Sequence, residues 1–226
     1  MPAHDERVDE VVLEALAQEL WGWLLAGLAV DAPGREPVEA MGRVPERVLQ
    51  DERGFEDGDE AGHRWCEEKG YPGYTSYASL DDLPRRAPAF AELEGQLLKQ
   101  AGRAAEELGW DIDAKDITLD ALWINILGEG GHHPGHIHPG SVLSGTLYIA
   151  VPEGAGDIRF EDPRLARMMA APPLLDTVEE DQKRFVYVAP KPGELLMWES
   201  WLRHEVMPGR SEEPRISISF NFGHRA

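Results

Sequence analysis

Four histidines lie within seven residues of the sequence, in the segment GGHHPGHIHPG at 130–140. His136 and His138 are one residue apart, and side chains with this spacing on an extended strand point to the same face. Two imidazoles on one face can bind a single metal ion. His132 and His133 cannot both join them, because adjacent side chains on a strand point apart. We therefore interpret His132 and His133 as part of a turn near the site.

A third metal ligand must come from another part of the chain, and His204 is the candidate. It lies in WLRHEVMPG, at the start of a short apolar segment that ends in a Pro-Gly turn. Further on, in RISISFN, Arg215 and Ser217 share one face of a predicted strand. A guanidinium beside a hydroxyl can bind a carboxylate through two hydrogen bonds. The pattern predicts a metal site with an anion-binding arginine close to it.

Short strands are predicted to position these residues. Apolar, β-branched and aromatic residues gather in short runs after residue 109, and turns rich in glycine and proline separate the runs. This pattern favours a β-sandwich or jelly roll. The predicted strands are Ile117–Leu127, Val142–Val151, Asp157–Phe160, Phe185–Val188, Glu194–Trp198, His204–Met207 and Arg215–Phe222.

Helices are predicted in the first half of the chain. Residues 88–108 carry an apolar stripe with helical spacing and are expected to pack on a sheet. Residues 5–29 also have a helical period, whereas 31–73 is polar and rich in glycine and proline. For that segment we expect irregular structure with at most short helices. The segment 161–183 is long for a connection and is expected to be a lid or binding loop.

The chain of 226 residues suits a single domain. We expect residues 1–70 to form a helical and irregular extension and residues 71–226 to form the β-rich core. The net charge of −20 disfavours nucleic acids and anionic membranes as partners. One cysteine allows no internal disulfide, and the apolar run at 20–30 is too short to span a bilayer. These features predict a cytoplasmic protein, and its oligomeric state stays open, with a homodimer among the options.

Six sequence segments, taken in order, resemble the Fe(II)/2-oxoglutarate-dependent dioxygenases. Within that superfamily they are most similar to bacterial 2OG-Fe(II) oxygenases related to prolyl hydroxylases. The resemblance spans about residues 71–222. Its segments are GYTSY (73–77), LWINILGEGG (122–131), HIHPGSVLSGTLYIAVP (136–152), IRFEDPR (158–164), PKPGELLMWESWLRHEV (190–206) and RISISFN (215–221).

The resemblance implies a mainly β fold, a double-stranded β-helix around Fe(II), supported by N-terminal helices. His136 matches the first metal ligand of the family, and His204 matches the distal one. The resemblance also implies a hydroxylase that consumes O2 and 2-oxoglutarate and releases succinate and CO2. Its substrate would be a small molecule or a peptidyl group.

The resemblance further implies a binding site for the 2-oxoglutarate cosubstrate. Arg215 matches the arginine that pairs with the far carboxylate of 2-oxoglutarate. Ser217 and Tyr148 match positions that often help to hold that carboxylate. Asn125 is a candidate contact to the cosubstrate or the substrate.

One position departs from the family pattern, because His138 stands where the family usually has an Asp or Glu ligand. Either three histidines bind the metal, which we favour, or an acid from elsewhere completes the site. Two other interpretations stay open. One is a cupin-like metalloenzyme that does not use 2-oxoglutarate, and the other is a non-catalytic jelly roll that binds a metal or another ligand.

Overall fold

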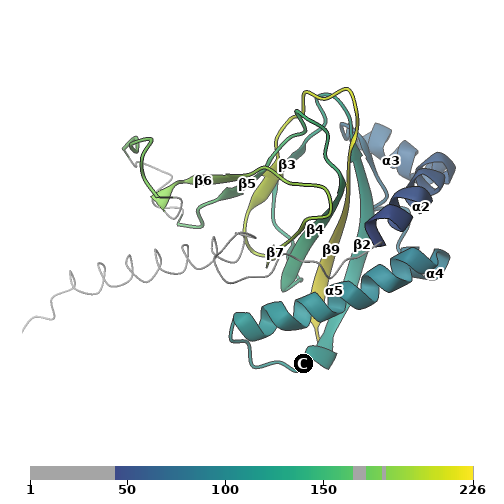
Figure 1. Ribbon diagram of the computed structural model, residues 1–226, viewed down its shortest axis with the longest axis horizontal. Helices are drawn as coiled ribbons and strands as arrows, with labels where there is room; N and C mark the ends of the chain where they lie inside the picture. The colour runs from purple at the N-terminus through teal and green to yellow at the C-terminus, as the bar shows by residue number, and fades with distance from the viewer. Residues whose placement is uncertain (1–43, 165–171, 180–181, 226) are drawn as a thin grey trace, which may run out of the picture.

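The computed structural model describes residues 44–164, 172–179 and 182–225. The predicted helix at 5–29, the apolar run at 20–30 and parts of the loop at 161–183 lie outside the described residues. Two β-sheets form the centre of the molecule, and α5 and α2 lie along one side of the larger sheet (Figure 1). Among the described helices, none is both long enough and apolar enough to cross a bilayer.

The two sheets contain only antiparallel pairings and define a double-stranded β-helix, as predicted. The larger sheet has, in spatial order, β1 (Tyr74–Thr75), β2 (Ile117–Leu127), β9 (Arg215–His224), β4 (Leu143–Ala150) and β7 (Leu195–Glu199). The smaller sheet has the order β3 (His133–His136), β8 (His204–Val206), β5 (Ile158–Glu161) and β6 (Phe185–Val188). All seven predicted strands are present, with shifts of one or two residues at some ends, whereas β1 and β3 were not predicted.

Strand β9 separates the hydrophobic core from the space between the sheets. Its residues alternate, so apolar and polar side chains leave the strand on opposite faces. The apolar set packs into the main hydrophobic core, which also contains residues of α5. This set is Ile216, Ile218, Phe220 and Phe222, and the polar set is Arg215, Ser217, Ser219 and Asn221. The polar set therefore faces the smaller sheet.

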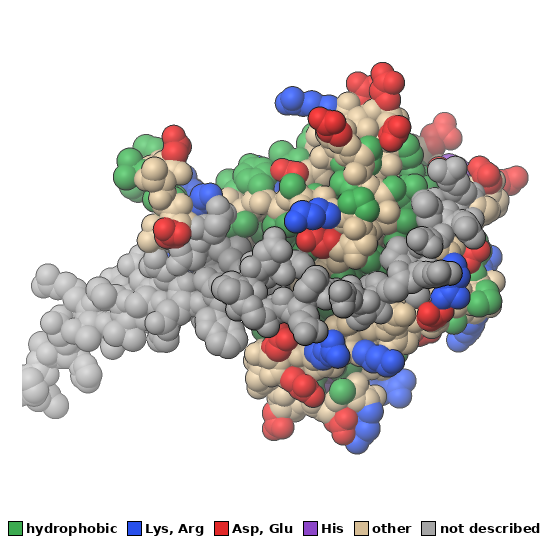
Figure 2. All heavy atoms as spheres, viewed as in Figure 1, with side chains coloured by type: hydrophobic (Ala, Val, Ile, Leu, Met, Phe, Trp, Pro, Cys, Tyr) green, Lys and Arg blue, Asp and Glu red, His purple; other side chains and the backbone are tan. Residues whose placement is uncertain are grey.

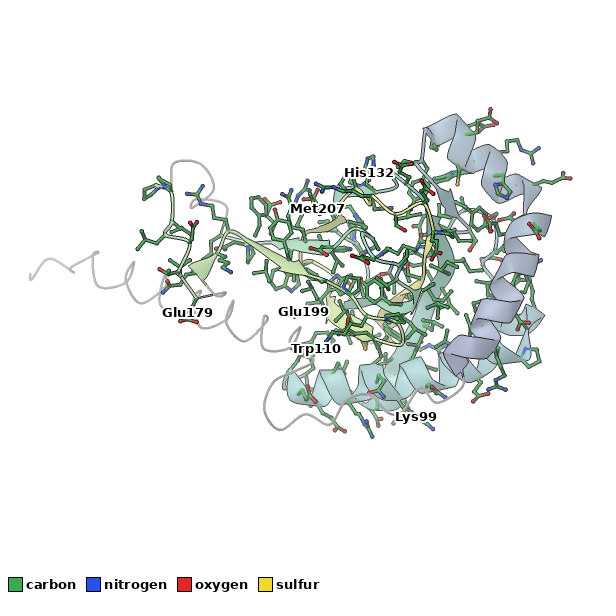
Figure 3. The ribbon with its side chains drawn as sticks, turned by 45° about the horizontal axis from the view of Figure 1, so that its top comes forward. Lys99, Trp110, His132, Glu179, Glu199 and Met207 are labelled. Carbon is green, nitrogen blue, oxygen red and sulfur yellow. The ribbon has the colours of Figure 1, made fainter. Side chains whose placement is uncertain are left out.

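Helix α5 (Pro88–Glu107) confirms the helix predicted at 88–108. Pro88 occupies the first turn, where the missing backbone N–H costs no hydrogen bond. Leu93 and Leu97 are fully buried against the larger sheet, whereas Lys99 is on the outer side of the helix (Figure 3). The apolar stripe thus determines which face of the larger sheet α5 covers, and the cavity lies on the opposite face.

The prediction of irregular structure at 31–73 was wrong for its second half. Two helices occupy that part, α2 (Val44–Gly58) and α3 (Glu60–Lys69). Helix α2 is stabilised by tertiary packing, since Phe55 and Phe90 of α5 make an edge-to-face contact with ring centres 5.8 Å apart. Such packing overrides the weak helix propensity of its glycines. A short α4 (Leu83–Arg86) and a 3-10 turn (Ala114–Asp116) complete the helical segments.

Local hydrogen bonds set both ends of α3. The carboxylate of Asp59 accepts the backbone N–H of Gly62 at 2.9 Å and so caps the first turn. At the other end, Gly70 adopts a left-handed conformation with φ of 62°, which a glycine tolerates without strain. The chain then turns towards β1 and the cavity.

On the visible face of the molecule, acidic side chains are spread among lysines and arginines (Figure 2).

Candidate metal centre

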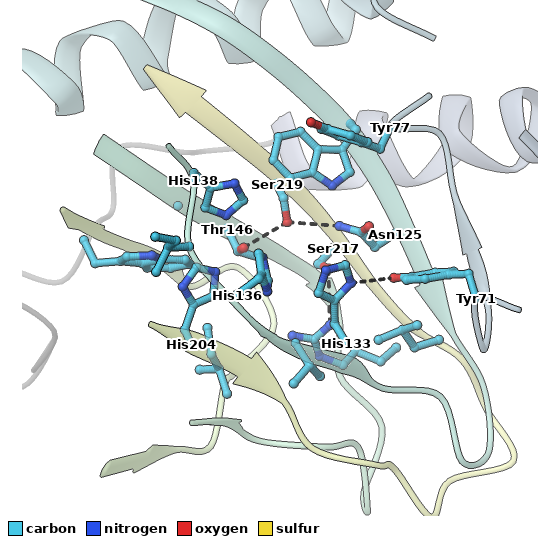
Figure 4. A pocket seen from close by; sticks show the side chains of 18 of the residues that line it. Tyr71, Tyr77, Asn125, His133, His136, His138, Thr146, His204, Ser217 and Ser219 are labelled. Atoms are coloured by element: carbon cyan, nitrogen blue, oxygen red, sulfur yellow. Dashed lines mark hydrogen bonds between the residues drawn. The ribbon is translucent and has the colours of Figure 1, made fainter. Parts of the chain in front are cut away.

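A cavity of about 300 Å³ lies between the two sheets. Histidines, aromatic rings and the polar face of β9 form its walls (Figure 4). No described residue that lines it is acidic, although the whole chain is strongly acidic. Its volume suits a small-molecule ligand.

His136, His138 and His204 converge in this cavity (Figure 4). One nitrogen from each ring lies within 4.8 Å of those of the other two rings. The last residue of β3 and the first of β8 face each other in the smaller sheet, which brings His136 opposite His204. His138 follows the end of β3, and its backbone N–H donates to the carbonyl of Ser200 at 3.0 Å. The sequence thus predicted three residues that the fold does bring together.

Two of these imidazoles are oriented by backbone carbonyls. Nδ1 of His136 lies 2.9 Å from the oxygen of Pro134, and Nδ1 of His204 lies 2.9 Å from the oxygen of Leu202. A carbonyl only accepts hydrogen bonds, so each Nδ1 carries the proton and each Nε2 keeps its lone pair. Contacts of this kind fix the tautomer of metal-binding histidines.

Burial keeps the three imidazoles neutral. Together with the neighbouring His136, it lowers the pKa of His138 to about 4. Burial also lowers the pKa of His136, and it lowers that of His204 well below the usual value. A neutral imidazole is the form that binds a metal ion.

Among the described residues, no acid takes the place of His138. Within the described ranges, His136, His138 and His204 are the one group of three or more His, Cys, Asp or Glu residues with this proximity. Of the two ligand sets that the sequence left open, the three-histidine set is the one that the described residues bring together.

Arg215 lies in the same cavity and is 4% exposed. Its guanidinium donates to the hydroxyl of Ser217 at 3.3 Å, as the shared strand face predicted. In the described part of the chain, no carboxylate lies within ion-pair distance of it, and its Nε has no hydrogen-bond partner. A buried cation without a counterion is costly. An anion bound in the cavity would neutralise this charge.

The other two predicted cosubstrate residues are placed differently. Tyr148 lies behind Arg215 and does not line the cavity, with its ring centre 4.9 Å from the guanidinium carbon. Its buried hydroxyl has no partner, and burial raises its pKa while Arg215 opposes the rise. Asn125 does line the cavity, but its amide accepts from Thr75 at 2.9 Å and donates to Ser219 at 3.0 Å.

His133 is a cavity residue that the sequence analysis placed in a turn. It begins β3, its ring centre is 4.4 Å from that of His136, and its Nδ1 lies 3.2 Å from the Tyr71 hydroxyl. Burial lowers its pKa to about 4. The register of β3 shifts between His133 and His136, which breaks simple alternation. The intervening Pro134-Gly135 was the available signal, since such residues mark irregular strands.

Aromatic side chains line part of the cavity, and most of them come from the segment before residue 121. Tyr77 is 56% exposed and contacts Trp123 edge to face, with ring centres 5.1 Å apart. Trp65 and Tyr71 line the same cavity. Trp123 itself forms part of the cavity wall.

Fold and site together define a double-stranded β-helix with a three-histidine centre and a buried arginine. The model of a family described as "Putative 2OG-Fe(II) oxygenase" matches residues 121–221, which include all three histidines and Arg215. Residues 121–221 are thus similar to the 2OG-Fe(II) oxygenase family, in line with the resemblance seen in the sequence. No curated protein matches the chain.

Solved structures that are similar to this chain have low sequence identity to it. The α-ketoglutarate-dependent epimerase SnoN of nogalamycin biosynthesis is 14% identical with a TM-score of 0.55, and the alignment covers 93% of this chain and 84% of SnoN. A prolyl-4-hydroxylase from Pseudomonas putida is 19% identical with a TM-score of 0.42, over 62% of this chain and 64% of that one. A Burkholderia pseudomallei oxidoreductase of the 2OG-Fe(II) oxygenase family is 14% identical with a TM-score of 0.41, over 54% and 50%.

This chain thus spans less than two thirds of the Pseudomonas and Burkholderia proteins and most of SnoN. The likeness to SnoN supports the fold.

Proposed function

We propose that this protein is an Fe(II)- and 2-oxoglutarate-dependent oxygenase. The observation that carries the proposal is the presence of His136, His138, His204 and the unpaired, buried Arg215 in one cavity. A metal-binding protein needs only the histidines. A buried guanidinium without an acid partner calls for an anionic ligand beside the metal.

The residues fit Fe(II). Imidazole nitrogen suits iron, although it also suits Zn(II), Cu(II) and Ni(II), so the ligand set alone does not choose the metal. Three ligands from two neighbouring strands and the residues after one of them leave room for further ligands at the metal. When bound, iron would supply the oxidation of the substrate by O2, coupled to conversion of 2-oxoglutarate into succinate and CO2.

The residues also fit a dicarboxylate. Arg215 would hold the far carboxylate of 2-oxoglutarate through its planar fork, and the Ser217 hydroxyl, which it contacts, would donate a further hydrogen bond. The unpartnered Nε of Arg215 and the unpartnered Tyr148 hydroxyl point to a group that is missing from their surroundings. The other wall of the cavity is aromatic and would exclude water from the reacting atoms.

Hydroxylation of a small-molecule or peptidyl substrate is the outcome that we propose. SnoN, which shares the fold, is described as an α-ketoglutarate-dependent epimerase, so the products must be identified directly. The aromatic side chains of Tyr77 and Trp123 would contact the substrate. The sequence segment before residue 121 would then determine much of the substrate preference.

Anaerobic titration of the Fe(II)-loaded protein with 2-oxoglutarate tests the proposal. A visible charge-transfer band that saturates with 2-oxoglutarate is expected, and succinate should form once O2 is admitted. Succinate, which lacks the keto group, serves as the control ligand and should give no band. Metal binding without a band would overturn the proposal and leave a metalloprotein that does not use 2-oxoglutarate. Absence of both metal binding and a band would leave a non-catalytic jelly roll.

A further inference from the structure

His138 differs from the other two histidines in what holds its Nδ1. Backbone carbonyls hold those of His136 and His204, whereas the Nδ1 of His138 lies 3.2 Å from Nδ2 of the Asn221 side-chain amide, whose Oδ1 faces Ser144. A carbonyl dictates one tautomer, but a carboxamide has both an acceptor and a donor. The atom that Asn221 presents therefore decides which nitrogen of His138 carries the proton.

The two orientations of the amide have opposite consequences for metal binding. If Nδ2 of Asn221 donates to Nδ1 of His138, the imidazole proton lies on Nε2, which then cannot bind a metal. If Oδ1 faces His138, it accepts the Nδ1 proton and leaves the Nε2 lone pair free. The two orientations occupy the same space, since they exchange only the oxygen and nitrogen positions.

A buried pair of serine hydroxyls allows the amide to adopt either orientation without losing a hydrogen bond. Ser144 contacts Oδ1 of Asn221 at 2.8 Å and the hydroxyl of Ser200 at 2.7 Å, and either serine can be the donor in the second contact. With the amide exchanged, Nδ2 would donate to Ser144, which would donate to Ser200. Both serines are 1% exposed and Asn221 is 6% exposed, so water does not replace these bonds.

The strand register places these groups with little freedom. Ser144 of β4 and Asn221 of β9 are directly paired in the larger sheet. Ser200 follows β7, and its carbonyl accepts the N–H of His138. Backbone bonds thus fix the positions of all four residues, so the chain of side-chain bonds can change direction while the atoms stay in place.

We propose that Asn221 is the positioning residue that sets the metal-binding tautomer of His138 when its amide is exchanged so that Oδ1 faces Nδ1, with Ser144 and Ser200 completing its hydrogen bonds. The inference rests on the proposed function only in taking His138 as a metal ligand. It explains how a histidine serves where the family usually has an acid, because Asn221 gives His138 the fixed orientation that the carbonyls give the other two ligands. On this basis Asn221 has no contact with the metal and acts through His138.

Zinc binding to the metal-free full-length protein tests the inference without any need for turnover. Asn221→Leu removes both hydrogen-bonding atoms at similar size and should weaken Zn(II) binding by about 10- to 100-fold, the usual range for such supporting contacts. Asn221→Asp keeps an acceptor towards Nδ1 and should therefore bind Zn(II) at least as tightly as the native chain. Thermal melts of both metal-free variants identify a loss of folding.

Nitrogen-15 chemical shifts of the histidines in the zinc-loaded protein give a readout that a merely structural role would not move. The expected signature for His138 is a protonated Nδ1 and a metal-bound Nε2 in the native chain, retained in Asn221→Asp. A proton on Nε2 of His138 would overturn the inference, as would an Asn221→Leu variant with native zinc affinity. His138→Ala separates the two proposals. If it also binds zinc like the native chain, His138 is no ligand and the proposed three-histidine site fails as well.

Discussion

The guanidinium carbon of Arg215 lies 4.9 Å from the centre of the Tyr148 ring, so an aromatic face stabilises a buried charge that lacks an acid partner. Because no carboxylate of the described residues pairs with this guanidinium, it can bind an anionic ligand. The ring helps to explain how the buried arginine is tolerated. This pair gives the first prediction.

Arg215→Gln should weaken 2-oxoglutarate binding by about a hundredfold or more, because two charge-assisted hydrogen bonds are lost. Iron content should remain native, since Arg215 is not among the metal-binding group. Arg215→Lys keeps the charge but loses the planar fork, so its affinity for 2-oxoglutarate should lie between those of the native chain and Arg215→Gln. The measurement is anaerobic titration of the charge-transfer band. Arg86→Gln, which removes an exposed arginine paired with Asp82, is the matched control and should behave as the native chain.

The second prediction concerns the position where the family usually has an acid. His138→Ala should lower bound iron at least tenfold, because one of three ligands is lost. His138→Asp should retain iron, since it restores the common set of two histidines and one carboxylate. Metal analysis after dialysis against a weak chelator measures both. His132→Ala is the control, because His132 does not line the cavity, and its iron content should be unchanged. Native iron in His138→Ala would exclude His138 as a ligand.

Most of the fold could be predicted from the sequence because its signals are local. The alternation in RISISFN and the apolar stripe at 88–108 each reflect burial of one face, and both elements are present as predicted. Helix α2 could not be predicted, because contacts such as Phe55 with Phe90 stabilise it and join segments far apart in the sequence. Propensity alone undervalues such segments.

The site could be predicted from the sequence to a similar extent, and there are physical reasons why some of its residues were missed. The spacing of His136 and His138 and the face shared by Arg215 and Ser217 depend only on strand geometry, so their convergence could be expected. His133 reaches the cavity through an irregular register in β3, which simple alternation does not represent. Asn221 shares a strand face with Arg215, but its contact to His138 depends on pairing between strands.

A third prediction tests the packing that holds the larger sheet. Leu97 is fully buried on α5 against that sheet, so Leu97→Ala should lower the free energy of unfolding by about 2–5 kcal/mol through lost burial and the cavity it leaves. Urea unfolding of the metal-free protein provides the measurement. Lys99→Ala on the exposed side of the same helix should change stability by less than about 0.5 kcal/mol. Equal effects of the two changes would contradict the packing described for α5.

The fourth prediction follows from the lowered pKa values of the cavity histidines. Burial lowers the pKa of His133 and His138 to about 4, whereas an unfolded chain titrates near the ordinary value of 6.5. Between these values the unfolded state binds more protons than the folded state. Above about pH 6.5 these neutral imidazoles should therefore cost the metal-free protein no stability. As the pH falls towards 4, its free energy of unfolding should decrease.

Urea midpoints measured from pH 8 to pH 5 test this dependence above the range in which most carboxylates titrate. His133→Gln should flatten the fall in stability below pH 6.5, because one buried imidazole no longer has to stay neutral. His63→Gln, at an exposed position of α3, is the control and should keep the native slope. A native slope in His133→Gln would mean that His133 does not resist protonation in the folded protein. Bound metal should shift the fall to lower pH, since it occupies the same neutral nitrogens of the three ligand histidines.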